Sequence, residues 1–196
     1  ADRMLDMGFL PDLDQIIRFL PENRQSLLFS ATFSDQIRKL GRSYLKKPVE
    51  IEVAKCNAIA STLRQMAHLI PGEKKKSTLL QLLRDREPEQ AIVFTNSRAG
   101  AASLSSYLKF SSFKAASIHG SKTQSDRMKT LELFKRGLLK ILVATDVAAR
   151  GLNIIGVPCV INFDLPCNPQ DYVHRIGRTG RAGTKGDAIT LYTLNE

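Results

Sequence analysis

The sequence predicts an α/β fold in which helices cover both faces of a parallel β-sheet. From about Arg64 onward, short apolar segments alternate with longer amphipathic ones. The apolar segments are continuous, which is typical of strands buried on both faces. The expected strands are Gln65–Ile70, Ala91–Thr95, Ala115–His119, Lys140–Thr145, Cys159–Phe163 and Ala188–Thr193. The expected helices are Ser77–Arg86, Arg98–Phe110, Gln124–Arg136 and Pro169–Arg175.

The third of these helices shows the pattern most clearly. Met128, Leu131 and Phe134 are spaced to line one helical face, and Gly137 is suited to end the helix. Functional residues in parallel sheets gather in the loops at the carboxyl ends of the strands. The loops that follow the expected strands are therefore where we look for a site.

Residues 1–53 read as the end of another α/β unit, and residues 54–63 as a linker before the main domain at residues 64–196. Apolar residues between Ile16 and Leu20 indicate a helix that Pro21 closes. A short buried strand is expected at Ser26–Ser30, and Ser34 is expected to cap a helix that runs to about Leu45. The alternating segment Val49–Val53 predicts a second strand.

The composition bounds the class of protein. The chain has 196 residues, 43% apolar and 24% charged, which suits one globular domain and a fragment of another. We find no signal peptide and no apolar stretch near the roughly 20 residues of a membrane helix, so no membrane partner is expected. Cys56, Cys159 and Cys167 are isolated, which favours a reducing, cytoplasmic setting and argues against a cysteine metal site.

The charge is unevenly distributed. The chain has 29 basic and 19 acidic side chains, a net charge of +10. Residues 1–61 contain 9 basic and 8 acidic residues, so residues 62–196 contain 20 and 11, a net of +9. Such an excess favours a polyanionic partner such as nucleic acid, although it also serves solubility.

Four loops contain candidate functional residues. Ser30-Ala31-Thr32 follows an apolar segment, and by itself it is more often an ordinary loop or helix cap. His119-Gly120 comes before Gln124 and Arg127, where a helix start would welcome an anion. By itself this second pattern is more often a glycine turn with an exposed arginine.

The third loop places Thr145, Asp146, Arg150, Gly151 and Asn153 directly after a strand. These side chains could bond a phosphate backbone and a sugar, and a capped turn is an equally good interpretation. The fourth runs from His174 to Gly183 and includes Arg175, Arg178 and Arg181. Three arginines among three glycines suit a polyphosphate, because the guanidinium fork binds phosphate oxygens in bidentate geometry. A disordered basic loop is the weaker alternative.

In order and spacing, these motifs resemble those of the DEAD-box ATP-dependent RNA helicases. His174–Arg181 resembles motif VI of that family, and Ser30-Ala31-Thr32 resembles motif III. Ile92–Asn96 is similar to motif IV, and Thr145–Asn153 is similar to motif V. The segment that contains His119, Gly120, Gln124 and Arg127 is similar to motif IVa. Ala1-Asp2 and the residues up to Phe9 look like the end of the DEAD box and its continuation. The residues within these motifs are most similar to those of the bacterial RhlE-type branch.

The resemblance implies a RecA-like second domain that closes on a first RecA-like domain around ATP, Mg²⁺ and RNA. It implies Arg178 and Arg181 as arginine fingers on the γ-phosphate, with His174, Arg175, Ser30 and Thr32 organising the contact between domains. Asp146, Gly151 and Asn153 would approach the nucleotide. The RNA backbone would be held, without sequence readout, by Thr95, Asn96, Gly120, Gln124, Arg127, Thr145 and Arg150. A monomer is the default expectation.

Two departures from the family pattern affect what we expect. Asn153 stands where the family typically has Asp, which alters a ribose contact. No phosphate loop of the type Gly-x-x-x-x-Gly-Lys-Ser/Thr occurs, since Gly72–Ser77 has the wrong spacing. The first Asp and Glu of the DEAD box are absent, so no metal ligand is expected here, and ATP and Mg²⁺ would be bound mainly by the missing part of the first domain. We expect that this chain alone does not hydrolyse ATP.

Two other functions stay open at this point. A helicase-like ATPase acting on DNA would use the same two domains, and a basic surface does not distinguish RNA from DNA. A non-catalytic RNA-binding domain could also retain the fold, but Arg178 and Arg181 argue against it, because a pure binder needs no γ-phosphate contacts.

Overall fold

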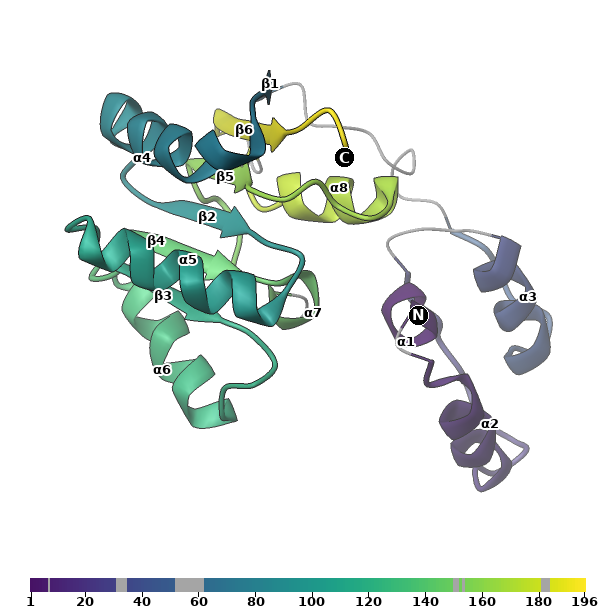
Figure 1. The fold of residues 1–196 in the computed structure, drawn as a ribbon. Helices are drawn as coiled ribbons and strands as arrows, with labels where there is room; N and C mark the ends of the chain where they lie inside the picture. Colours follow the sequence, from purple (N-terminus) through teal and green to yellow (C-terminus); the bar gives the residue numbers. More distant parts are fainter. Residues whose placement is uncertain (7, 31–34, 52–61, 150–151, 153, 181–183) are drawn as a thin grey trace. The chain divides into compact units, whose positions relative to one another are not determined.

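The structure is a computed structural model that describes residues 1–6, 8–30, 35–51, 62–149, 152, 154–180 and 184–196. The chain divides into two compact units, Ala1–Ala58 and Ile59–Glu196. Figure 1 shows helices in the first unit and a helix-covered sheet in the second. Within the described residues, no helix combines the length and the apolar character needed to cross a membrane.

The second unit confirms the predicted α/β fold. Its strands form one sheet in the order β1-β6-β5-β2-β4-β3, and every neighbouring pair is parallel. The strands are β1 (Leu63–Leu69), β2 (Ala91–Phe94), β3 (Ala115–Ile118), β4 (Ile141–Ala144), β5 (Cys159–Asn162) and β6 (Gly186–Tyr192). The helical elements are η1 (Gly72–Lys74), α4 (Lys75–Arg86), α5 (Arg98–Phe110), α6 (Gln124–Lys135), α7 (Asp146–Ala149) and α8 (Pro169–Ile176).

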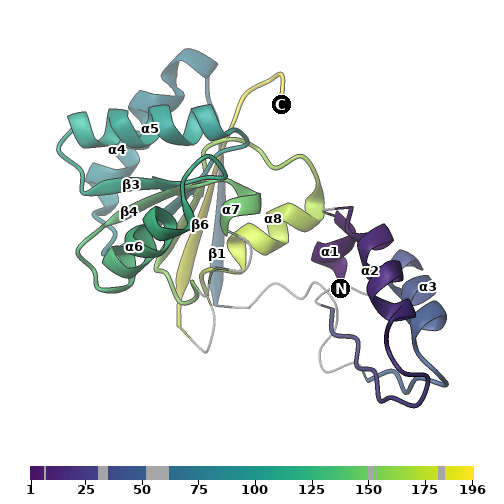
Figure 2. The ribbon, with the colours of Figure 1, turned by 90° about the horizontal axis from the view of Figure 1, so that it is seen from below.

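Alternation along the strands divides the core into two layers, one on each face of the sheet. Figure 2 shows α5 and α6 on opposite faces of the sheet. In β2, Ala91 and Val93 face one layer, while Ile92 and Phe94 face the other. The first layer contains Leu79 and Leu83 of α4 and Leu104 and Leu108 of α5. The second contains Leu131 and Phe134 of α6 and Ala148 and Ala149 of α7. All four residues of β2 are buried, which explains why the strand reads as a continuous apolar run.

Local sequence signals set the helix ends. The side chains of Ser97, Thr123 and Asn168 each accept a hydrogen bond from a backbone N–H in the first turn of α5, α6 and α8. These caps satisfy donors that a helix start otherwise leaves free. Gly137, with a φ of 71°, follows α6 and confirms the predicted stop.

The first unit differs from its prediction. Its described helices are α1 (Asp2–Asp6), α2 (Leu10–Arg18) and α3 (Asp35–Tyr44). The strand predicted at Ser26–Ser30 is wrong, as is Val49–Ile51 of the second predicted strand. Among the described residues neither segment pairs with a strand, and a segment without the hydrogen bonds of a ladder is not a strand. Leu27 and Phe29 are correspondingly 70% and 80% exposed.

Three further details complete this comparison. Residues 52 and 53, Ser34 as a cap and linker residues 54–61 lie outside the described residues. Met128 is 52% exposed and does not share the buried face of Leu131 and Phe134, so that part of the helix prediction is wrong. The short helix α7 was not predicted, because four residues are too few for a periodic pattern.

An ion-pair group joins the edge of the sheet to α4. The carboxylate of Asp187 on β6 accepts two hydrogen bonds from Arg64 of β1, both 2.9 Å, and one from Arg86 of α4, also 2.9 Å. Chiefly through the hydrogen bonds from Arg64, these contacts hold the pKa of Asp187 below its usual value, against the effect of burial.

We predict that Asp187→Asn lowers the free energy of unfolding by about 1 kcal/mol at neutral pH, the upper range for partly exposed pairs. Because the folded-state pKa of Asp187 lies below its unfolded-state pKa, the ionised group stabilises the fold above the unfolded value. That contribution is lost as pH falls through the folded-state pKa. Urea unfolding of both forms at pH values from about 7 down to about 3 should therefore show the difference shrinking. An equal difference at every pH would contradict this account.

Candidate functional site at the carboxyl edge of the sheet

The residues singled out in the sequence converge on the carboxyl edge of the second unit. The loops after β2, β3 and β4 begin with Thr95, His119 and Thr145, and α8 returns to this edge from the loop after β5. Among the described residues, no three His, Cys, Asp or Glu side chains come close enough to hold a metal ion.

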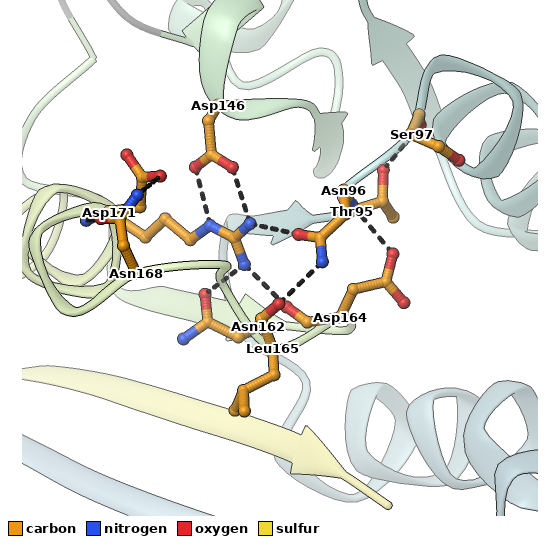
Figure 3. Close-up of polar contacts among 10 residues, drawn as sticks. Thr95, Asn96, Ser97, Asp146, Asn162, Asp164, Leu165, Asn168 and Asp171 are labelled. Carbon is orange, nitrogen blue, oxygen red and sulfur yellow. Dashed lines mark hydrogen bonds and ion pairs between the residues drawn. The ribbon is translucent and has the colours of Figure 1, made fainter. Parts of the chain in front are cut away.

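Arg175, in the last turn of α8, forms the centre of this edge. Its side chain is only 1% exposed, yet each of its five N–H groups has an acceptor. Nε and Nη2 bind the two carboxylate oxygens of Asp146 at 2.7 Å, and Nη2 also donates to Oδ1 of Asn96 at 2.7 Å. Nη1 donates to the carbonyl of Asp164 at 2.7 Å and more weakly to Oδ1 of Asn162 at 3.4 Å. Figure 3 shows these acceptors arranged around one guanidinium group.

The surroundings of Arg175 extend into the core. Its guanidinium carbon lies 5.3 Å from the centre of the Phe94 ring, within range of a cation–π contact. Asn162 extends the hydrogen-bond network to β6, because its side-chain amide donates to the hydroxyl of Thr190 at 3.1 Å. Arg175 thus joins the ends of β2, β4 and β5 with α8. The resemblance implied that Arg175 organises a contact between domains, but among the described residues its side chain bonds to partners within the second unit.

Two residues expected to hold RNA are bonded inside the protein. Thr95 is fully buried, and its hydroxyl donates to the carbonyl of Ser97 at 3.3 Å. Asn96 lies at the surface, but its side-chain amide donates to the carbonyl of Leu165 at 2.7 Å and accepts from Arg175. Asp146, expected near the nucleotide, likewise gives both carboxylate oxygens to Arg175.

The loop after β3 gathers cationic side chains. Arg98, at the start of α5, lies over Gly120, where an added Cβ would come within 3.3 Å of its Nε. His119 is buried, and within the described part of the chain its Nδ1 has no hydrogen-bond partner. Burial, followed by the nearby charges of Lys122 and Arg98, lowers the pKa of His119, which favours the neutral imidazole. Both charges that lower this pKa, those of Lys122 and Arg98, are thus positive.

Arg127 lies on α6 and touches the neighbouring helix α7. It donates to Oε1 of Gln124 at 3.1 Å and to the carbonyl of Ala148 at 3.3 Å. Its buried Nε has no acceptor among the described residues. A buried guanidinium N–H without an acceptor costs free energy, and an incoming anion would remove that cost. Gln124 and Arg127, both of which the resemblance implied as RNA contacts, are thus hydrogen-bonded to each other.

The arginine-rich segment is described only in part. Arg178 is half-buried after the end of α8 and donates to the carbonyls of Leu152 and Ile154 at 3.3 and 3.5 Å. His174 is also half-buried, in the last turn of α8. The predicted residues Arg181, Arg150, Gly151 and Asn153 lie outside the described residues.

In the first unit, the N-terminal residues meet the segment before α3. The N-terminal ammonium group donates to the carbonyl of Phe29 at 2.6 Å, and the backbone N–H of Asp2 donates to Oγ of Ser30 at 3.3 Å. The two candidate motifs are thus adjacent. Thr32, predicted with Ser30, lies outside the described residues.

The sequence interpretation missed three residues of this edge: Arg98, Asn162 and Asp164. Arg98 could have been found, because it follows the cap residue Ser97 directly after a strand. Asn162 and Asp164 gave less signal. They fall inside and just after the last expected central strand, and only the fold shows that they face Arg175.

Fold and site together define a class of protein. Proteins with an open parallel α/β sheet bind their ligands outside the carboxyl ends of the strands. Here that edge carries a buried arginine network and several further cations, which suits a phosphate-containing ligand.

Comparison with known proteins narrows the class. Residues 74–183 match the helicase conserved C-terminal domain, and residues 1–40 match the DEAD/DEAH box helicase family. CshA of Bacillus cereus, a DEAD-box ATP-dependent RNA helicase, is 45% identical over 196 residues, which are 100% of this chain and 37% of CshA. RhpA of Helicobacter pylori, another such helicase, is 42% identical over 193 residues, 98% of this chain and 39% of RhpA.

A solved structure agrees with the sequence matches. The crystal structure of a DEAD box protein from Methanococcus jannaschii superposes with a TM-score of 0.66 at 39% identity, covering 100% of this chain and 52% of that one. The chain therefore belongs to the DEAD-box helicase family, whose conserved C-terminal domain matches more than half of it, and its second unit has the RecA-like fold of that family. It spans less than two fifths of the length of these two relatives.

We predict that Arg175→Lys lowers the free energy of unfolding by about 3 kcal/mol, although it keeps the charge. A lysine ammonium has three donors and no fork, so it cannot replace the bidentate pair with Asp146 and the bonds to Asn96 and Asp164 together. Urea unfolding of the chain measures the change, with Arg84→Lys on the exposed side of α4 as the matched control. A loss below about 1 kcal/mol would show that the network contributes little.

Proposed function

We propose that this chain is the C-terminal part of a protein that couples ATP hydrolysis to the local unwinding of RNA duplexes. Membership of the DEAD-box family supports this activity for the whole protein. The observation that carries it within the chain is the cationic group at the carboxyl edge, where Arg127 has a buried Nε without an acceptor among the described residues. In this proposal the acceptor is an RNA phosphate.

The RNA-binding part of the proposal rests on backbone contacts. Arg98, Lys122 and Arg127 supply positive charge, and the missing side chain of Gly120 leaves room for the guanidinium group of Arg98, which is proposed to meet the RNA backbone there. Gln124, Thr145 and Arg150 are proposed to assist. Contacts to phosphate and sugar position a strand without reading its bases, so no sequence preference is expected.

The nucleotide part rests on the arginine-rich segment. Arg178 and Arg181 are proposed to reach the γ-phosphate of ATP, with His174, Gly151 and Asn153 nearby and Ser30 and Thr32 contributing from the first domain. ATP, when bound, would supply the phosphoryl group, and Mg²⁺ and the arginines would together stabilise the negative charge on that group during its transfer. In this structure Arg178 donates to carbonyls of the chain, so it must change partners to act.

The finer features of the proposal concern organisation. We propose residues 1–53 as the remnant of the first RecA-like domain, 54–63 as the linker and 64–196 as the second domain. We also propose, from the residues within its motifs, that the protein belongs to the bacterial RhlE-type branch. A monomeric, cytoplasmic protein is also proposed, which the free cysteines Cys159 and Cys167 support.

We predict that the chain binds single-stranded RNA weakly and that Arg127→Ala weakens this binding about fivefold. Removing one phosphate contact should also reduce the slope of log affinity against log salt by about 0.7. Fluorescence anisotropy at two salt concentrations measures both. Arg136→Ala, at the exposed opposite end of the same helix, removes the same charge and serves as the control.

Two outcomes would contradict parts of this proposal. Equal loss of affinity in the two variants would show that binding follows net charge alone and would contradict a site at Arg127. In the full-length protein, stimulation of ATP hydrolysis by DNA rather than by RNA would support the alternative of a DNA-directed ATPase.

We predict that Arg178→Ala in the full-length protein lowers RNA-stimulated ATP turnover at least about a hundredfold, because an arginine finger contributes about 10³–10⁵ to the rate. Steady-state ATP hydrolysis at saturating RNA measures this loss, with Arg84→Ala on the exposed side of α4 as the control. The isolated chain should show no turnover. Unchanged turnover in Arg178→Ala would show that its assignment as an arginine finger is wrong, whereas no turnover in the unsubstituted full-length protein would favour a non-catalytic RNA-binding role.

A further inference from the structure

The loop after β2 is fixed from inside by residues that follow β5. The backbone N–H of Asn96 donates to Oδ2 of Asp164 at 2.9 Å, and its Nδ2 donates to the carbonyl of Leu165 at 2.7 Å. Its Oδ1 accepts from Arg175 at 2.7 Å. Figure 3 shows Asn96 lying between Asp164 and the guanidinium group. Both polar ends of the side chain and the backbone N–H are thus already occupied.

The same network reaches Arg178. Arg175 is in the last turn of α8, and its carbonyl accepts the backbone N–H of Arg178 at 3.1 Å. The direction in which Arg178 leaves α8 therefore depends on how Arg175 is held. Asp146 holds that guanidinium from the β4 side, and Asn96 holds it from the β2 side.

The charge of Asp164 argues against a place for it in an RNA contact. A carboxylate beside an RNA phosphate is repelled, whereas as an acceptor for the N–H of Asn96 it is well placed. An asparagine whose amide already has partners at both ends would also have to break these bonds to contact RNA.

We propose that Asn96 and Asp164 are positioning residues: they hold Arg175, and through it the end of α8, so that the loop after β2 and Arg178 keep one relative geometry. This inference rests on the proposed function, because it assigns Arg178 to the γ-phosphate. It replaces a direct RNA contact by Asn96 with an internal one.

The expected effect follows from one charge-assisted hydrogen bond. Losing such a bond where Arg178 is oriented should reduce turnover about tenfold or more. In the full-length protein, Asp164→Ala and Asn96→Ala should lower kcat by this factor at saturating RNA and ATP. Asp164→Ala should leave the Kd for single-stranded RNA within a factor of two.

Gln90→Ala is the matched control. Gln90 comes just before β2, at the end of the strand opposite to Asn96, and its side-chain amide donates to the carbonyls of Phe134 and Leu139. The substitution removes a pair of internal hydrogen bonds comparable to those of Asn96, without touching Arg175. Its kcat should stay within a factor of two of the unsubstituted protein.

A second measurement does not depend on activity. In the chain itself, Asn96→Ala should accelerate hydrogen exchange at the amides of residues 177–179 at least fivefold, and Gln90→Ala should not. Faster exchange confined to the loop after β2 would overturn the proposal, as would an unchanged kcat. A fivefold or greater loss of RNA affinity in Asp164→Ala would also overturn it, by assigning this residue to RNA. If the unsubstituted full-length protein shows no RNA-stimulated turnover, the proposed function fails, and hydrogen exchange alone decides the positioning role.

Discussion

The carboxyl edge of this domain depends on one buried positive charge. A guanidinium removed from water must recover its hydration from the protein, and Arg175 does so with one carboxylate, two side-chain amides, a carbonyl and an aromatic ring. Because these partners come from different strand ends, satisfying the charge requires that the ends take one arrangement. Loops that the sequence presents as separate motifs are therefore a single structural unit.

Much of the fold could be predicted from sequence because its signals are local. Strands buried on both faces read as apolar runs, and Ser97, Thr123 and Asn168 mark helix starts by side-chain chemistry that acts within one turn. The failures in the first unit have a non-local cause. The segments around Leu27 and Val49 have strand-like composition, but a strand also needs a partner, which composition does not supply.

The site shows the same division between local and non-local information. The sequence pattern pointed to loops that meet at one edge of the sheet, and two of the residues it selected, Arg127 and Gln124, are hydrogen-bonded to each other. It could not tell which polar side chains turn inward, because that depends on what the fold places opposite them. Thr95 and Asn96 look identical to solvent-facing loop residues in the sequence, whereas in the structure each is hydrogen-bonded inside the protein. Asp164 carries no motif of its own, and only the path of the chain after β5 brings it to Asn96.

The position of β6 between β1 and β5 has a consequence for how this domain is made. Among the described residues, β1 is the first strand of the second unit and pairs with β6 alone, and the paired residues Arg64 and Asp187 are 123 positions apart. The central strands β2, β4 and β5 can assemble while the ribosome is still extending the chain, but β1 gains its neighbour when β6 emerges. The pairing of β1 is thus delayed until β6 has been synthesised, and it requires the closing of one very long loop.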